Sequence, residues 1–383
     1  MFVSPKERVL TMNIEKMIYV YLVICVGMIL FNIVSAFLSR RRDKRILRVS
    51  NGFEDRIRSE LIWLETHSAV HSAHKNYLSG KLKRISNMRA FDAALEKKHL
   101  ENPTLVRKYL YSIGSVFVSL SIEYCKKDSM EAAYFPYIIK KYRILSDRPF
   151  DAMIDILFRL LHEPSIYCRE NAMQALYTIG DASCIVKALK IIDNENKFYH
   201  SKLLTDGLLN FAGNTQRLNA ALWETFEDFS REMQITLLNY FRFSSGDHCE
   251  DILRLMKDTS QDDELRFACI RYFGKYRYEP AYEYLLLYAN SRTDMRWEYA
   301  AIASSVLASY PSEKTVEILK SNLYHRNWHI RFNSAQSLER LGLTYLDLID
   351  VLEGHDRYAS EILRYHFDVR DMIRAEKEDA SIC

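Results

Sequence analysis

The sequence predicts an all-α protein, an α-solenoid of paired helices preceded by one N-terminal transmembrane helix. Two observations lead to this fold class. A stretch of 22 residues near the N-terminus contains no charged side chain, and a thirteen-residue phrase returns at a nearly constant interval through the second half of the chain. The first predicts a membrane helix, and the second predicts stacked helical repeats.

The uncharged stretch runs from Met17 to Leu38. As a helix rising about 1.5 Å per residue, it is long enough to cross the ~30 Å hydrocarbon core of a bilayer. A buried core helix usually carries a polar stripe, and a cleaved signal peptide has a shorter apolar region that follows its basic residues. We therefore expect a transmembrane helix at 17–38, preceded by a short extracytoplasmic segment at 1–16.

A basic juxtamembrane segment follows at residues 39–50. It holds one acid, Asp43, and six basic side chains: Arg40, Arg41, Arg42, Lys44, Arg45 and Arg48. Short flanks this basic stay in the cytoplasm, so we expect a single-pass protein of the cell membrane with a cytoplasmic C-terminal domain. The six side chains are predicted to lie at the membrane surface against anionic headgroups, although a plain topology signal explains them equally.

Residues 51–150 are helical in pattern but do not keep the phase of the repeat. Apolar residues from Phe53 to Leu64 and from Leu78 to Leu95 recur three or four residues apart. Asn102-Pro103-Thr104 opens a further helix, predicted over Leu105 to Tyr124. Residues 130–145 are interpreted as a degenerate first repeat, which makes this a membrane-proximal helical region that begins the array.

The repeated phrase begins as CRENAMQALYTIG at Cys168 and ends as IRFNSAQSLERLG at Ile330. Its second residue, the anchor, recurs 32 or 33 residues apart, at Arg169, Lys202, Gln234, Arg266, Glu298 and Arg331. Three and seven residues after each anchor the side chain is mostly small or apolar, which is the spacing of one helix face.

Residues around each anchor predict where its helix begins and ends. Four residues earlier stand Ser165, Phe198, Ser230, Asp262, Asp294 and Asn327, of which five can accept a bond from first-turn amides. Eleven residues later three copies have Gly180, Gly213 and Gly342, which permit a left-handed helix stop. A second amphipathic stretch follows each copy, so helical pairs must stack on one another. We place the array at 151–365 and a tail at 366–383.

This pattern resembles the HEAT-repeat family, in its short bacterial form. The resemblance covers residues 130–365 and is best at Arg169, Arg266 and Arg331. It implies polar contacts from the anchor Arg between repeats, which Gln234 and Glu298 would not provide. Tetratricopeptide and ankyrin arrays have similar periods, but their signature residues are missing. The resemblance also permits catalysis, because phycobilin lyases and alkyl-base DNA glycosylases are HEAT-like.

Composition limits the classes of partner and compartment. After residue 48 the chain holds 44 basic and 47 acidic side chains, and this balance makes nucleic acid an unlikely partner. Seven cysteines are scattered without a Cys-x-x-Cys spacing, which is typical of a reducing compartment: Cys25, Cys125, Cys168, Cys184, Cys249, Cys269 and Cys383.

Candidate chemical sites are few. His67, His71 and His74 have the spacing of metal ligands on a helix, but no carboxylate or thiol completes a set, and a solvated face is the expected interpretation. His325 and His329 flank Trp328 at a repeat turn, where histidine is ordinary. The sequence has no nucleophile elbow, phosphate loop or His-Glu-x-x-His motif. We therefore expect no metal, no cofactor and no enzyme activity.

The segment from Arg266 to Tyr288 interleaves basic and tyrosine side chains, the residues that anchor many protein interfaces. The predicted partner-binding residues are Arg266, Arg271, Tyr272, Lys275, Tyr276, Arg277 and Tyr278. Contacts with a neighbouring repeat would explain some of them as well. Our hypothesis is a non-catalytic, membrane-anchored scaffold or adaptor that binds a membrane-associated protein, such as a membrane enzyme or a transport complex. The alternative is a HEAT-like enzyme, of lyase or DNA glycosylase type, acting through the concave face.

Overall fold

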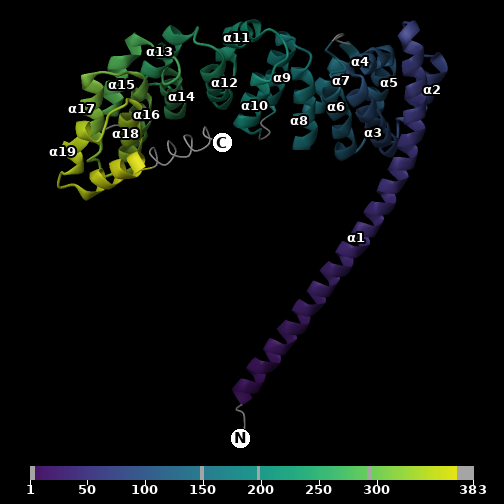
Figure 1. The fold of residues 1–383 in the computed structure, drawn as a ribbon, viewed down its shortest axis with the longest axis horizontal. Helices are drawn as coiled ribbons and strands as arrows, with labels where there is room; N and C mark the ends of the chain where they lie inside the picture. Colours follow the sequence, from purple (N-terminus) through teal and green to yellow (C-terminus); the bar gives the residue numbers. More distant parts are fainter. Residues whose placement is uncertain (1–4, 147–150, 196–198, 291–295, 369–383) are drawn as a thin grey trace, which may run out of the picture. The chain divides into compact units, whose positions relative to one another are not determined.

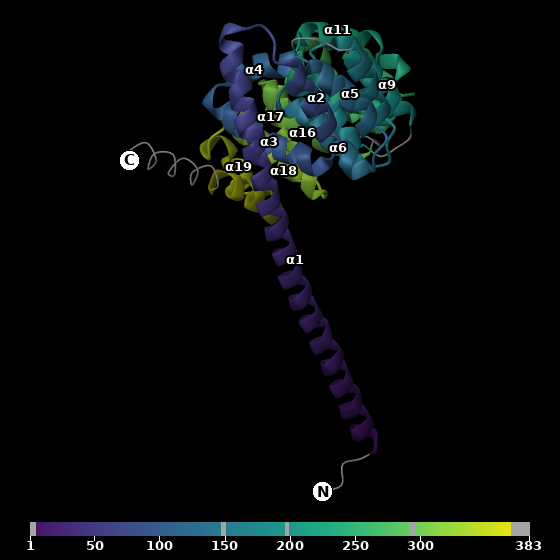
Figure 2. The same cartoon turned by 90° about the vertical axis from the view of Figure 1, so that its right-hand side faces the viewer.

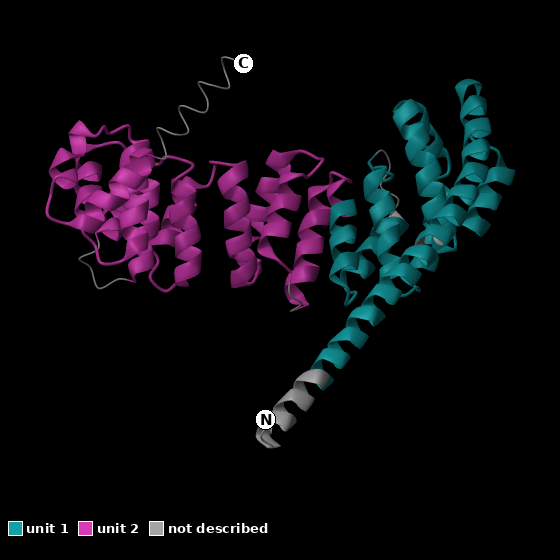
Figure 3. Ribbon diagram, turned by 60° about the horizontal axis from the view of Figure 1, so that its bottom comes forward, with its two compact units in different colours: residues 1–175 teal, residues 176–383 magenta. Residues whose placement is uncertain are grey.

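The computed structural model describes residues 5–146, 151–195, 199–290 and 296–368. Every regular element within these ranges is helical, which confirms the all-α prediction (Figure 1). The chain divides into two compact units, Met1–Ala175 and Leu176–Cys383 (Figure 3). The division falls inside the helix that carries the first copy of the phrase, and each unit is described by itself.

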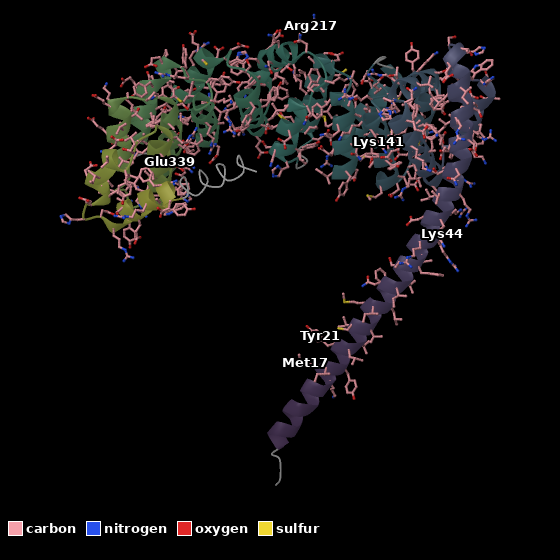
Figure 4. All side chains as sticks on the ribbon, viewed as in Figure 1. Met17, Tyr21, Lys44, Lys141, Arg217 and Glu339 are labelled. Atoms are coloured by element: carbon pink, nitrogen blue, oxygen red, sulfur yellow. The ribbon has the colours of Figure 1, made fainter. Side chains whose placement is uncertain are left out.

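Unit 1 begins with α1 (Pro5–Thr66), a single continuous helix (Figure 2). No proline follows Pro5 within it, so no ring interrupts its ladder of hydrogen bonds. The apolar stretch from Met17 to Leu38 and the basic segment at 39–50 are consecutive parts of this helix (Figure 4). Large apolar side chains along that stretch are exposed, and α1 is long and apolar enough to cross a membrane.

The last part of α1 packs in the core of unit 1. The predicted stripe of Phe53, Ile57, Leu61 and Leu64 is buried, and α1 lies against α3 (Ile85–Glu101) and α4 (Pro103–Ser112). The remaining helices of this unit are α2 (Ser72–Lys81), α5 (Gly114–Tyr124), α6 (Ser129–Lys141), α7 (Asp151–Leu161) and α8 (Ile166–Tyr177), the last of which runs two residues into unit 2.

The single helix predicted over Leu105 to Tyr124 is wrong. Its start is as expected, because Pro103 opens α4 and the Asn102 side chain accepts a bond from the Leu105 amide at 3.0 Å. The chain leaves the helical conformation at Ile113, and α5 begins at Gly114. The expected helix is thus divided into two, of which α4 packs on α1 and α5 packs on α2.

Unit 2 is a series of short helices. They are α9 (Ala182–Asn194), α10 (Ser201–Leu209), α11 (Thr215–Glu224), α12 (Arg231–Ser244), α13 (Cys249–Lys257), α14 (Asp263–Phe273), α15 (Tyr282–Ala289), α16 (Trp297–Val306), α17 (Glu313–Asn322), α18 (Trp328–Arg340) and α19 (Ile349–Leu352), and residues 357–368 are also helical. The helices that carry the phrase pack in chain order, α10 on α12, α12 on α14, α14 on α16 and α16 on α18.

Hydrogen bonds join residues one period apart in unit 2. The Asn333 side chain donates to the carbonyl of Ala301 at 2.7 Å, Asn322 to Ala289 at 2.8 Å and Ser337 to Ser304 at 2.7 Å, while the Tyr278 amide donates to the Tyr310 hydroxyl at 3.0 Å. The partners in each pair are 32 or 33 residues apart in the sequence. The period of the phrase is therefore also a period of contacts.

Two of the anchors bond to the segment that precedes their own helix, whereas Arg266 bonds to residues of α13 and α15. Arg331 donates through Nη1 to the carbonyls of His325 and Arg326, just before its own helix. The side-chain amide of Gln234 donates to the carbonyl of Phe226 at 3.1 Å, so it also bonds to the segment that precedes its own helix. Arg331 and Gln234 thus tie their helices to the segments that precede them, because long polar side chains reach back toward the helix start.

The predicted caps and glycines are confirmed in part. Ser230, Asp262 and Asn327 accept bonds from the first amides of α12, α14 and α18, whereas Phe198 and Asp294 lie outside the described residues. Gly180 and Gly342 have positive φ, as expected. Gly213 has another role, because a Cβ atom there would lie 2.1 Å from the carbonyl oxygen of Gly180. It allows two turns to approach closely.

Candidate partner-binding surface

Of the seven predicted partner-binding residues, Arg266 and Tyr272 are buried inside unit 2. Arg266 is buried and donates to the carbonyl of Met256 at 3.0 Å and to the hydroxyl of Tyr288 at 3.1 Å. Tyr288 donates to the same carbonyl at 3.1 Å. These bonds join α13, α14 and α15, so Arg266 holds the fold together in this structure.

Tyr272 and Tyr276 are also part of the packing. Tyr272 is fully buried and donates to the carbonyl of Ser245 at 2.9 Å, and burial raises the pKa of its hydroxyl well above the usual range. Tyr276 is half-buried, with its ring 5.0 Å from that of Tyr272 and in contact with Gly246. The glycine leaves room for this ring, because a Cβ atom would stand 2.8 Å from it.

The other predicted residues are more open. Lys275 and Arg277 are exposed, and Arg277 pairs with Glu279 at 3.2 Å. Arg271 is half-buried, and burial lowers the pKa of its guanidinium. Tyr278 is half-buried and supplies the amide that bonds to Tyr310. The segment therefore offers a small basic edge, while most of its tyrosines connect neighbouring helices.

A larger surface lies at the other end of unit 2. We name it the terminal aromatic surface: Trp297 on α16, Trp328, His329 and Phe332 on α18, and Tyr358 and Tyr365 on the helix at 357–368. Trp297 is 43% exposed, Trp328 51%, Tyr358 65% and Tyr365 58%. Large aromatic side chains this exposed are the residues that dominate the energetics of protein interfaces.

Ring contacts make this surface continuous. The ring of Trp297 stacks on His329 with centroids 5.2 Å apart, and the Trp328 ring lies 5.1 Å from the same histidine. Trp328 also stacks on Phe332 at 4.8 Å. Rings in contact hold one another in place, so they lose little conformational entropy when a partner binds.

A cavity of about 570 Å³ opens in this surface between α18 and the helix at 357–368. Its walls combine aromatic rings with one cation and one anion, and the lining residues are Trp328, Arg331, Phe332, Tyr358, Glu361, Ile362 and Tyr365. Arg331 lies over the ring of Tyr358 at 5.4 Å, while its Nε is buried without a hydrogen-bond partner. The cavity thus combines apolar walls with one guanidinium and one carboxylate, a chemistry that suits a large apolar side chain with a polar end.

A buried histidine forms part of the support beneath the rings. His366 lies 4.7 Å from the ring of Phe332 and 3.7 Å from the carboxylate of Glu339. Burial lowers the pKa of His366, and the carboxylate opposes that shift. The neutral imidazole packs as an aromatic ring.

A charged rim borders the surface beside Trp297. Arg296 donates to Asp263 at 3.0 Å and to Glu298 at 2.8 Å, and Tyr299 donates to Asp263 at 2.5 Å. The hydroxyl of Tyr299 and then Arg296 lower the pKa of the Asp263 carboxyl. Glu298, an anchor that departs from Arg, is thus part of a surface ion-pair chain.

The predicted basic segment is exposed on α1. Arg40, Arg41, Lys44, Arg45 and Arg48 are exposed, and Arg41 lies 4.3 Å from the ring of Phe37. The side chain of Arg42 lies outside the described residues. Nothing in the fold covers the five described cations, so all are accessible to a membrane surface.

The three histidines of the metal-like motif are engaged in packing. His71 pairs with Glu60 at 3.1 Å, His67 stacks on Trp63 at 3.3 Å, and buried His74 bonds through Nε2 to the hydroxyl of Tyr109 at 2.7 Å. The ring of Trp63 contacts both His67 and His71, the second at 4.3 Å, whereas His74 contacts Tyr109. Among the described residues no group of three His, Cys, Asp or Glu side chains is arranged to hold a metal ion.

Sequence reasoning missed the terminal aromatic surface. A signal was present, because two of the four tryptophans, Trp297 and Trp328, stand one and three residues before successive anchors. The abundance of tyrosine favoured the preceding copy instead, where Tyr272 and Tyr288 are buried and the other tyrosines are half-buried. Comparison with protein-family models and with curated proteins finds no match for this chain.

Proposed function

We propose that this protein is a non-catalytic, membrane-anchored adaptor whose HEAT-like α-solenoid binds a membrane-associated partner protein, such as a membrane enzyme or a transport complex. The observation that carries the proposal is the terminal aromatic surface, where Trp297, Trp328 and Tyr358 are exposed in one contiguous cluster beside Arg331. Trp, Tyr and Arg are the side chains enriched at interface hot spots.

The repeat geometry supports the solenoid and the HEAT-like assignment. Helices bearing the phrase pack in chain order, and hydrogen bonds recur at the spacing of the phrase, as between Asn333 and Ala301. The aromatic surface lies between the helix of the last copy, α18, and the helix at 357–368, and the exposure of its rings agrees with a docking role.

The membrane anchor is supported by α1. Its stretch from Met17 to Leu38 is apolar and exposed, which is unfavourable in water and favourable in lipid. The basic segment after it favours a cytoplasmic location for the two units. An adaptor fixed in this way meets its partner at the membrane, where the local concentration of membrane proteins is high.

The test is site-specific crosslinking in the native membrane. A photoreactive residue at Tyr365, which is 58% exposed in the same surface, should crosslink one defined membrane protein. The double variant Trp328→Ala/Tyr358→Ala should lower recovery of that protein at least about tenfold, because truncating each of these interface side chains costs more than about 1 kcal/mol of binding free energy.

The matched control truncates two exposed aromatics elsewhere, Tyr167→Ala and Phe243→Ala, which are 66% and 52% exposed. Recovery of the partner should be unchanged in this control. Equal loss in both variants, or no crosslink from position 365, would reject the surface. Alkaline extraction that released the intact chain from membranes would reject the proposal that α1 is a membrane anchor.

A further inference from the structure

The direction of α2 places one end of unit 1 near the basic segment. His71, just before α2, pairs with Glu60 of α1, whereas Tyr77, further along α2, lies 5.9 Å from the ring of Phe53. As α2 advances it contacts progressively earlier residues of α1. Its last residue, Lys81, is therefore nearest the end from which α1 continues toward the basic segment and the apolar stretch.

A second loop is held at the same end. The hydroxyl of Tyr124, the last residue of α5, donates to the carbonyl of Leu82 at 2.9 Å. Glu123 also pairs with Lys83 at 3.8 Å. The loop at 125–128 therefore lies beside residues 81–84, and we call these two segments the basic loops.

The basic loops carry an excess of positive charge. They contain Lys81, Lys83, Arg84, Lys126 and Lys127. The facing acids are Glu123, Asp128 and Glu131, of which Glu123 pairs with Lys83 and Glu131 with Lys127. Lys81, Arg84 and Lys126 are exposed. Beside them Met130, in the first turn of α6, is an apolar side chain that is 67% exposed.

The distance to the bilayer is short enough for this charge to matter. About twelve residues of helix separate Leu38 from the start of the packed part of α1, a rise of ~18 Å. The headgroup layer occupies about 5–7 Å of that height. A lysine side chain reaches several ångströms further, and the remaining gap is comparable to the Debye length of ~8 Å at physiological salt. If α1 tilts in the bilayer so that the basic loops lean toward the membrane, the gap between the loops and the headgroups becomes shorter.

We propose that the basic loops are a second membrane contact, which docks unit 1 on an anionic bilayer. The inference rests on the proposed transmembrane role of α1. Lys81, Arg84 and Lys126 supply attraction to anionic headgroups, and Met130 enters the interface. With α1 as a first attachment, this second contact limits the directions in which unit 1 can lie over the membrane.

The experiment measures amide hydrogen exchange in the full chain reconstituted in nanodiscs. One set contains phosphatidylcholine alone, and the other also contains phosphatidylglycerol. We expect exchange at residues 82–84 and 125–130 to slow at least about threefold with the anionic lipid, and the protection to disappear at high salt. Exchange in α16 and α18 should be the same in both lipids.

Two triple variants separate this contact from a general charge effect. Lys81→Gln/Arg84→Gln/Lys126→Gln should abolish the lipid-dependent protection. The control Lys202→Gln/Arg217→Gln/Arg326→Gln, which removes three exposed cations of unit 2, should retain it. Equal exchange in neutral and anionic discs, or protection that persists in the first variant, overturns the inference. A chain that fails to enter nanodiscs overturns the proposed transmembrane role of α1 instead. The experiment therefore distinguishes failure of the membrane anchor from failure of the contact made by the basic loops.

Discussion

The two units use polar contacts in different ways. In unit 1 the bonds converge on a few acidic residues. Asp92 of α3 accepts from the hydroxyls of Tyr134 and Tyr142 at 2.6 and 2.7 Å and from the ammonium of Lys141 at 2.8 Å. Glu54 of α1 receives both Lys97 and Lys98 of α3. One buried carboxylate thus fixes α6 and the residue after it against α3.

In unit 2 several bonds join residues one period apart. A single side chain to carbonyl bond, such as that of Asn333 in α18, joins a helix to the preceding phrase-bearing helix, here α16. Unit 2 thus distributes much of its polar stabilisation over neighbouring copies of the phrase, as the proposed solenoid would require. Unit 1 concentrates its polar stabilisation in single residues. The effects of substitutions should therefore differ between the two units, both in the loss of stability and in the number of helices affected.

The largest effect is expected at Asp92. The Asp92→Ala change removes the acceptor of two hydroxyls and an ammonium, and we expect it to destabilise unit 1 by about 3 kcal/mol. Urea-dependent hydrogen exchange of the full chain in detergent should show the loss across α3 and α6 together. The exposed Asp155→Ala is the control and should change exchange by less than about 0.5 kcal/mol. A loss confined to residues beside Asp92 would contradict the idea of a hub.

A smaller and more local effect is expected at one rung of the array. Asn333→Ala removes one bond to the carbonyl of Ala301 and should cost about 1 kcal/mol. The same measurement should show the change in α16 and α18, with α10 and α12 unaffected. Gln336→Ala on the same helix is the matched control. If the variant destabilised the whole unit, the array would be one cooperative block and the contrast with unit 1 would fail.

The smallest effect is the pH dependence carried by His74. Burial lowers the pKa of this imidazole, which is neutral where it bonds to Tyr109. The unfolded chain binds the proton more readily, so unit 1 should lose stability as the pH falls below about 6.5. His74→Gln should make the free energy of opening of unit 1 depend less on pH. The total difference over this pH range should be less than about 1 kcal/mol. The exposed His355→Gln should leave the slope unchanged. An equal slope in both variants would show that another group controls the acid sensitivity.

Several features of the fold could be predicted from the sequence because they depend on local patterns. The burial of Phe53, Ile57, Leu61 and Leu64 follows from their spacing, and the start of α4 follows from Asn102 and Pro103. The break at Ile113 could not be predicted, since it depends on which neighbours α4 and α5 pack against. The role of Gly213 likewise depends on the approach of Gly180, more than thirty residues earlier.

The candidate site shows the same limit more strongly. Tyr272 lies within a copy of the phrase and Trp328 stands two residues before another copy, and as large aromatic residues they are ranked alike by composition. Tyr272 is buried beneath a neighbouring helix, whereas Trp328 is half exposed near the end of the array. Exposure depends on whether another helix covers a position, and this information is not present in the local pattern.

The sequence by itself therefore determined the all-helical fold, the period of the repeated phrase, and the apolar and basic parts of α1, because propensity, spacing and charge act over a few residues. Only the tertiary structure decided which aromatic side chains face solvent, what the anchors bind, and that the basic loops lie at the end of unit 1 nearest the basic segment. Those properties depend on contacts between residues far apart in the chain, and such a contact forms only when both of the contacting segments have folded.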